Sequence, residues 1–199
     1  GFDPRSQGRY PFDKRWTTLL AEKLGEDYEV ISEGLNGRTT AYDKPDEAWK
    51  NGSSSFVACF GTHKPVDFLV IMLGTNDCVA RLHLSTEEIA KGVEILVDLT
   101  EEKSPELQGY MPRIVVTVPP AISEKYKDSP FAWELNDESV RKSREIGPLY
   151  REVAERHNCL FADASSCTEV SFDCMHLTEK GHAQLAELLY KVISGKAGE

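Results

Sequence analysis

Residues 68–77 have the sequence FLVIMLGTND, an apolar run that ends in glycine and polar residues. An uninterrupted apolar run of strand length predicts a strand buried on both faces, as in a parallel sheet. The change of composition at Gly74 predicts that this strand opens into a loop at its carboxyl end. Because open α/β sheets bind ligands at that edge, Asn76 and Asp77 become candidates for a functional site.

Strand and helix patterns alternate along the rest of the chain. The predicted strands are 28–33, 68–73, 114–118 and 159–163, and the predicted helices are 14–24, 56–62, a helix that starts after Ser85, 137–157 and 178–194. Ser85 and Glu88 have the spacing of a capping box. Gly147 and Pro148 favour a kink or break in the helix 137–157. The alternation predicts a single three-layer α/β domain over residues 1–199.

The order of the strands is expected to be flavodoxin-like, 2-1-3-4-5. A helix comes first in the sequence, with no strand before it to complete a βαβ unit. We therefore expect a sheet of five strands whose first strand, an interior one, precedes Gly1.

Composition restricts the function classes. The chain has 199 residues and a net charge of −10, which argues against nucleic-acid and anionic-membrane partners. No apolar run has the length of a membrane span. Its five cysteines are an odd number without Cys-x-x-Cys spacing, so we expect free thiols and a cytoplasmic location.

An acid and a base lie three residues apart near the C-terminus, as Asp173 and His176 in the sequence DCMH. A serine hydrolase needs an imidazole that takes the hydroxyl proton and a carboxylate that orients the imidazole. The alternative to a catalytic pair is an acid in a loop with a surface histidine nearby, and the Asp-x-x-His spacing alone does not exclude it.

Two further residues have the chemistry of an oxyanion hole. Asn76 offers a side-chain amide, and Gly37 in the sequence GLNGRTT (34–40) offers a backbone N–H. Tight turns also favour Gly and Asn, and this second interpretation suits Gly34. Asp77 and Arg38 are interpreted as structural residues, hydrogen-bonded to each other.

The sequences GLNGRTT (34–40), GTND (74–77) and DCMH (173–176) together resemble blocks II, III and V of the SGNH (GDSL-type) hydrolases. The bacterial arylesterase/acyltransferase group is the most similar. The resemblance implies a serine esterase or acyltransferase for short acyl esters, with His176 as base, Asp173 as its partner, and Asn76 and Gly37 as oxyanion donors. It also implies a homo-oligomer and no cofactor.

Two aromatic residues of the long loop 121–136, Phe131 and Trp133, are candidates for the entrance of such a site. They could equally anchor the loop. His157 and the late cysteines lack the paired spacing of zinc sites, so no metal is expected.

Block I of the family, Gly-Asp-Ser with the nucleophilic serine, does not occur in the sequence. The opening residues resemble the stretch that follows it, so we expect the nucleophile upstream of Gly1 or on a separate N-terminal fragment. Ser165, Ser166 and residues 53–55 lack the strand–turn–helix setting of a nucleophile.

The sequence is compatible with two rival functions. One is a non-catalytic homologue that binds a sugar or acyl ligand. The other is a flavodoxin-like nucleotide binder, which the absence of a Gly-rich phosphate loop disfavours.

Overall fold

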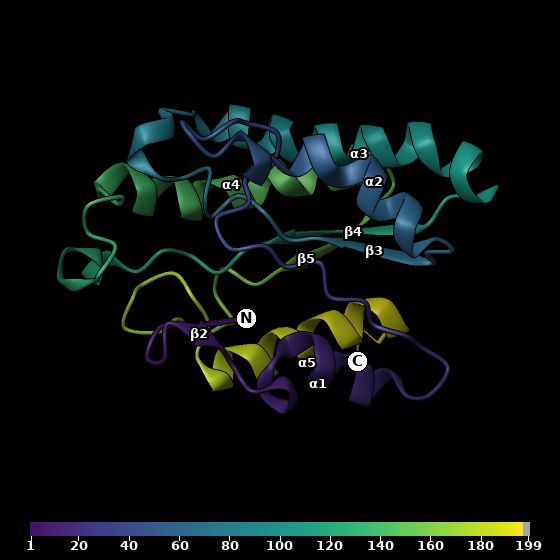
Figure 1. The fold of residues 1–199 in the computed structure, drawn as a ribbon, viewed down its shortest axis with the longest axis horizontal. Coiled ribbons are helices and arrows are strands. Elements are labelled where there is room, and N and C mark those ends of the chain that lie inside the picture. The colour runs from purple at the N-terminus through teal and green to yellow at the C-terminus, as the bar shows by residue number, and fades with distance from the viewer. Residues whose placement is uncertain (197–199) are drawn as a thin grey trace.

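The computed structural model describes residues 1–196 as three layers around a parallel sheet (Figure 1). The sheet has the strand order β3-β4-β5. Helices α2, α3 and α4 cover one face of this sheet, and α1 and α5 cover the other. The bounds are β1 (Phe2–Asp3), β2 (Gly8–Arg9), α1 (Trp16–Leu24), α2 (Gly52–His63), β3 (Phe68–Ile71), α3 (Thr86–Gln108), β4 (Arg113–Val118), α4 (Asp137–Arg156), β5 (Leu160–Asp163) and α5 (Glu179–Ser194). The three-layer α/β class is confirmed.

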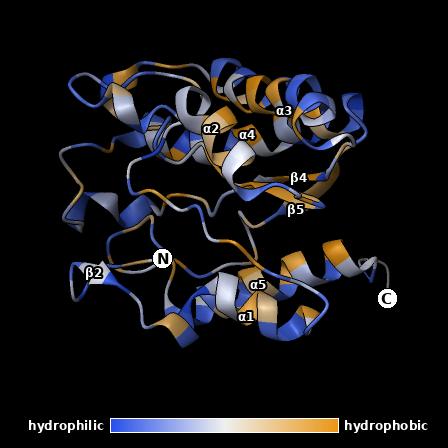
Figure 2. Cartoon of the chain, turned by 45° about the vertical axis from the view of Figure 1, so that its right-hand side comes forward, coloured by the Kyte–Doolittle hydropathy of each residue, from blue (hydrophilic) through white to orange (hydrophobic). Residues whose placement is uncertain are grey.

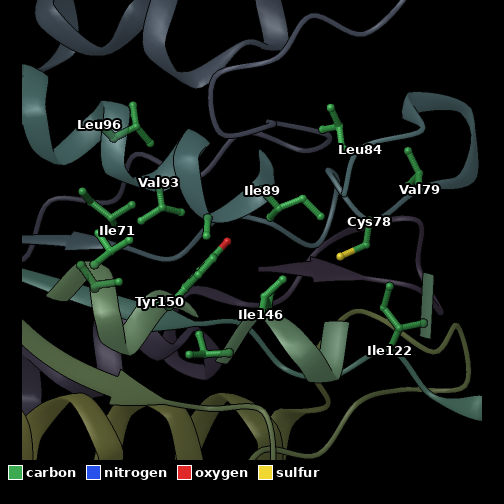
Figure 3. Packing of buried hydrophobic residues seen from close by; sticks show 14 of the residues in the cluster. Ile71, Cys78, Val79, Leu84, Ile89, Val93, Leu96, Ile122, Ile146 and Tyr150 are labelled. Carbon is green, nitrogen blue, oxygen red and sulfur yellow. The ribbon is translucent and has the colours of Figure 1, made fainter. Parts of the chain in front are cut away.

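The central strand β4 is buried on both faces, which explains its continuous apolar sequence. Val116 belongs to the core between the sheet and helices α3 and α4, whereas Val115 belongs to the core with α1 and α5. Figure 3 shows part of the first core, with Val93 of α3 and Ile146 of α4. Figure 2 shows hydrophobic residues on the sheet and on the helix faces that cover it. None of the helices within residues 1–196 is long and apolar enough to cross a membrane.

The prediction of a five-stranded sheet is not met, because the described chain contains three parallel strands. The predicted strand 28–33 is wrong as well. These residues pair with no strand, and Tyr28 and Ile31 are exposed. A strand needs a neighbour about 4.8 Å away to satisfy its backbone. Among residues 1–196 no strand lies beside 28–33, and β3 is an edge strand.

Helix ends follow the local sequence closely. Ser85 and Glu88 form the predicted capping box of α3, and Thr178 caps α5 by accepting from the N–H of Gly181. The predicted kink or break at Pro148 is not seen as an interruption, because α4 runs through it. Gly147 lies close to the sheet, since a Cβ atom there would be 3.8 Å from Oδ2 of Asp163 and 3.9 Å from Cγ1 of Val118.

Helix α3 approaches the loop at Thr40 very closely, and Gly92 makes this possible. A Cβ atom on Gly92 would overlap Oγ1 of Thr40 and lie 2.8 Å from its Cβ. Gly61 of α2 is a contrasting glycine, since a Cβ there would meet only Leu107 Cδ2 at 4.0 Å.

We therefore expect Gly92→Ala to lower the free energy of unfolding by about 1–3 kcal/mol, because the added methyl group overpacks the Thr40 contact. The control Gly61→Ala should raise the free energy of unfolding by roughly 0.5–1 kcal/mol through helix propensity. Urea denaturation of both variants measures this difference. Equal effects would contradict the close packing of α3 on Thr40.

Candidate active site

The loop between β5 and α5 holds Asp173 and His176 in one tight turn. The Asp173 side chain is fully buried, and its Oδ2 lies 2.7 Å from Nδ1 of His176. Its other oxygen, Oδ1, accepts the backbone N–H groups of His176 at 3.0 Å and Met175 at 3.3 Å. An ionised carboxylate can only accept, so the hydrogen of a neutral His176 resides on Nδ1. Nε2 is then free to act as a base.

The turn is held from outside by the loop that follows β4. The N–H of Ser123 donates to the carbonyl of Cys174 at 3.0 Å. Cys174 itself has φ of 73°, a left-handed conformation that is uncommon for a residue with a side chain. The hydrogen bond from Ser123 stabilises the turn that orients Asp173 and His176. No local sequence pattern predicted this contact.

Two aromatic rings lie on the imidazole of His176. The ring of Phe131 is 5.9 Å away between centroids, and the ring of Phe2, in β1, is 4.7 Å away. Of the two predicted entrance residues, Phe131 thus lies beside His176, whereas Trp133 is 72% exposed. Sequence reasoning missed Phe2, because its contact spans nearly the whole chain.

The hairpin that carries Phe2 also reaches the second half of the site. Phe2 pairs with Arg9 across the β1–β2 ladder. The guanidinium of Arg9 donates to the carbonyl of Gly34 at 3.0 Å. The hairpin therefore contacts both His176 and the loop that contains Gly37.

Gly37 and Asn76, the predicted oxyanion donors, are joined through Arg38. Gly37 has φ of 80° in a turn that closes with the N–H of Arg38 on the carbonyl of Leu35. Within residues 1–196 the N–H of Gly37 donates to no acceptor. Nδ2 of Asn76 donates to the carbonyl of Arg38 at 3.1 Å. Gly37 thus has an unengaged N–H, and the Asn76 amide is bonded to Arg38, the residue that follows Gly37. Donors of these two kinds are what an oxyanion hole uses.

Comparison with known proteins identifies the family of the chain. The sequence profile of the GDSL-like lipase/acylhydrolase family matches residues 2–184. The chain belongs to this family.

Solved structures of family relatives superpose closely. Est24, a carbohydrate acetylesterase from Sinorhizobium meliloti, is 31% identical, with a TM-score of 0.88 over 96% of this chain and 89% of that one. The M. smegmatis aryl esterase is 33% identical, with a TM-score of 0.87 over 94% and 87%. A carbohydrate acetylesterase family member from Sinorhizobium meliloti is 34% identical, with a TM-score of 0.91 over 100% and 94%. No curated protein sequence matched the chain.

Asp77 connects the two loops that carry Gly37 and Asn76, the predicted oxyanion donors. Its buried carboxylate accepts the backbone N–H of Thr40 at 3.0 Å and the Thr40 hydroxyl at 2.6 Å. The predicted pairing of Asp77 with Arg38 is wrong. The Arg38 guanidinium turns away and donates to the carbonyl of Glu33. Residue spacing could not predict which of the two residues Asp77 binds, because Thr40 and Arg38 lie in the same loop.

The end of β3 is fixed by a residue of α4. The hydroxyl of Tyr150 donates to the carbonyl of Leu73 at 2.9 Å, and Tyr150 is fully buried, as Figure 3 shows from close by. Gly74 follows with φ of 123°, and a Cβ there would overlap the Tyr150 hydroxyl. The glycine of GTND thus allows the contact that positions the loop of Asn76.

No serine hydroxyl in the described chain is hydrogen-bonded to His176. The hydroxyl of Ser165 donates to Asp163, and those of Ser53 and Ser54 donate to Asn51. These serines are occupied in turns and a helix cap, so none of them has the contact of a nucleophile in this family.

His157 lies among carboxylates, in a group with Asp98 and Glu101 whose atoms are close enough for a metal ion. Its Nδ1 faces Glu101 at 3.1 Å and its Nε2 faces Glu94 at 3.3 Å. Burial lowers the pKa of His157, but the hydrogen bonds to Glu101 and Glu94 outweigh it and raise the pKa. Both nitrogens act as donors in the protonated ring, so ion pairing accounts for this cluster.

The carboxylate of Asp77 gives a pH prediction. Burial raises its pKa from 3.8 to about 6, against the hydrogen bonds from Thr40 that lower it. Between these values the folded state binds the proton more tightly than the unfolded state, so the free energy of unfolding falls as pH rises. Asp77→Asn retains an oxygen for Thr40 and removes the titration. The stability of the native protein relative to this variant should decrease from pH 4 to pH 6 in urea titrations. A difference that is constant with pH would contradict this.

Asp173→Asn should lower kcat for an ester substrate by about 10⁴-fold while the protein stays folded. The asparagine oxygen can still accept from the N–H groups of Met175 and His176. Its NH₂ group would face Nδ1, which favours the wrong tautomer of the imidazole. Steady-state kinetics with p-nitrophenyl acetate measure the loss, and Asp128→Asn, an exposed acid, is the control. Full activity of Asp173→Asn would contradict the assignment.

Proposed function

We propose that this protein is a serine esterase that hydrolyses short-chain acyl esters through an acyl-enzyme. The observation that carries the proposal is the hydrogen bond between His176 Nδ1 and Asp173, which leaves Nε2 of His176 free to act as a base. The same chain supplies the candidate oxyanion donors Asn76 and Gly37. Family membership supports the reaction class, and the acetylesterase and aryl esterase relatives support small acyl groups.

Each residue has one task in the proposed reaction. Nε2 of His176 takes the proton of the serine hydroxyl as the serine oxygen attacks the ester carbonyl. The amide of Asn76 and the N–H of Gly37 bind the resulting oxyanion. His176 then gives the proton to the departing alcohol, which leaves the acyl-enzyme. In the second half of the reaction His176 takes a proton from water, and the water oxygen attacks the acyl carbonyl. The carboxylic acid is released as His176 returns the proton to the serine oxygen.

The serine is proposed to come from polypeptide outside residues 1–199, either upstream in the same protein or on a separate fragment. Two observations support this proposal. No described serine is hydrogen-bonded to His176, and among residues 1–196 one edge of β3 pairs with no other strand.

Further features follow as proposals from the same family likeness. Aryl, alkyl and carbohydrate alcohols are the expected leaving groups, and an alcohol could replace water as the acyl acceptor. Phe131, which lies against His176, would contact the acyl group, and Trp133 would line an entrance narrowed by a second copy in a homo-oligomer. The five free cysteines support a reducing compartment such as the cytoplasm.

The test is labelling of the full gene product with a fluorophosphonate probe, read by denaturing intact-mass spectrometry. We expect one adduct on a serine outside the 199 residues, on a chain heavier than 22.3 kDa or on a companion peptide. His176→Ala should abolish labelling and lower esterase kcat by about 10⁴-fold or more, because the base is lost. Asp128→Asn serves as the control.

An unlabelled, inactive protein that still binds acyl or sugar ligands would overturn the esterase proposal and favour a non-catalytic binding protein. Labelling of Ser165 or Ser53 would overturn only the proposed source of the serine.

A further inference from the structure

Lys44 is a buried lysine that pairs with no carboxylate in the described part of the chain. Its exposure is 3%, and burial lowers its pKa. A buried ammonium is costly unless a partner holds it. The one hydrogen bond of its Nζ within residues 1–196 goes to Oδ1 of Asn76, at 3.3 Å. The buried ammonium group of Lys44 thus contacts the side-chain amide of Asn76, the proposed oxyanion donor.

The acidic side chains around Lys44 are paired with other groups, so Asn76 is the hydrogen-bond partner of its ammonium group. Arg81 pairs with Glu134 at 3.1 Å and with Glu47 at 3.5 Å. Lys50 also pairs with Glu47. The two acids near Lys44 on the surrounding loops are therefore already paired with other cations. The remaining one, Asp77, is directed at Thr40.

The backbone on both sides of Lys44 is anchored. The carbonyl of Tyr42 accepts the hydroxyl of Thr39. The carboxylate of Asp43 accepts Nδ2 of Asn51 at 2.8 Å. The carbonyl of Lys44 itself accepts the N–H of Glu47 at 3.1 Å. The backbone that carries the Lys44 side chain is therefore held by hydrogen bonds within its own loop.

The amide of Asn76 has two partners of opposite polarity, and they determine its orientation. An ammonium can only donate, so Lys44 must face Oδ1, and a carbonyl can only accept, so Arg38 must face Nδ2. Rotation of the amide by 180° would place donor against donor and acceptor against acceptor. One hydrogen of Nδ2 remains for the oxyanion. A cation on Oδ1 also polarises the amide and strengthens its N–H donors.

We propose that Lys44 is a positioning residue of the oxyanion hole, which orients and polarises the Asn76 amide toward the developing oxyanion. This inference rests on the proposed esterase function. It predicts an effect on kcat with little effect on KM, because the benefit arises as negative charge develops on the substrate oxygen.

The first test compares Lys44→Met and Lys44→Gln in the full gene product with p-nitrophenyl acetate. Lys44→Met removes both the hydrogen bond and the charge, and should lower kcat about 10²-fold with KM nearly unchanged. Lys44→Gln keeps a donor without the charge and should lose roughly tenfold. Lys142→Met, which removes the other buried lysine, is the matched control and should keep its kcat.

The same variants distinguish positioning of Asn76 by Lys44 from a contribution of Lys44 to the stability of the fold alone. Removal of an unpaired buried charge should leave the urea midpoint of Lys44→Met unchanged or raise it. In a double-mutant cycle, Lys44→Met should cost little further kcat once Asn76→Ala is present. A lowered midpoint that accounts for the lost activity, or full additivity with Asn76→Ala, would overturn the proposal.

A readout without catalysis distinguishes failure of this inference from failure of the esterase proposal. The side-chain NH₂ of Asn76 should give two separated, slowly exchanging proton resonances in ¹H–¹⁵N spectra, and Lys44→Met should shift and broaden them. An inactive protein with this response would refute the esterase proposal alone. Resonances that do not respond to Lys44→Met would refute the positioning by Lys44.

Discussion

The arrangement of the proposed oxyanion hole depends on the hydrogen bonds of the buried Asp77 carboxylate. This carboxylate receives both the backbone N–H and the hydroxyl of Thr40. Gly37 lies just before Thr40, and Asn76 lies just before Asp77, so this one link brings two distant loops into register. An unsatisfied carboxylate in the interior would be costly, which keeps the loops from separating. The link also requires Gly92, because any larger residue in α3 would displace Thr40.

The base half of the site is held by different forces. Backbone hydrogen bonds form the turn of Asp173 and His176, and the loop after β4 braces it through Ser123. Aromatic packing by Phe2 and Phe131 restrains the imidazole ring. The hairpin then ties this half to the loop at Gly34. The carboxyl ends of the parallel strands converge at one edge of the sheet, and that convergence allows short loops to complete the site.

Stability and function oppose each other at Lys44. A well-packed apolar side chain at this position would avoid the cost of a buried ammonium. The lysine instead places its charge on the amide that would stabilise an oxyanion. Local departures from the usual rules of burial occur at functional sites, where a preorganised dipole outweighs the lost stability.

The sequence alone determined the features that depend on neighbouring residues. The apolar run before Gly74, the capping box of α3 and the contact of Asp173 with His176 are local, and all of them take the expected form. Only the tertiary structure decided which distant groups meet. Residues 28–33 have strand composition but pair with no strand, and Asp77 binds Thr40 instead of Arg38. Phe2 contacts His176 and Lys44 contacts Asn76, each across a long stretch of sequence. Periodicity reports which face of an element is buried, whereas the partner of a hydrogen bond is set by the path of the whole chain.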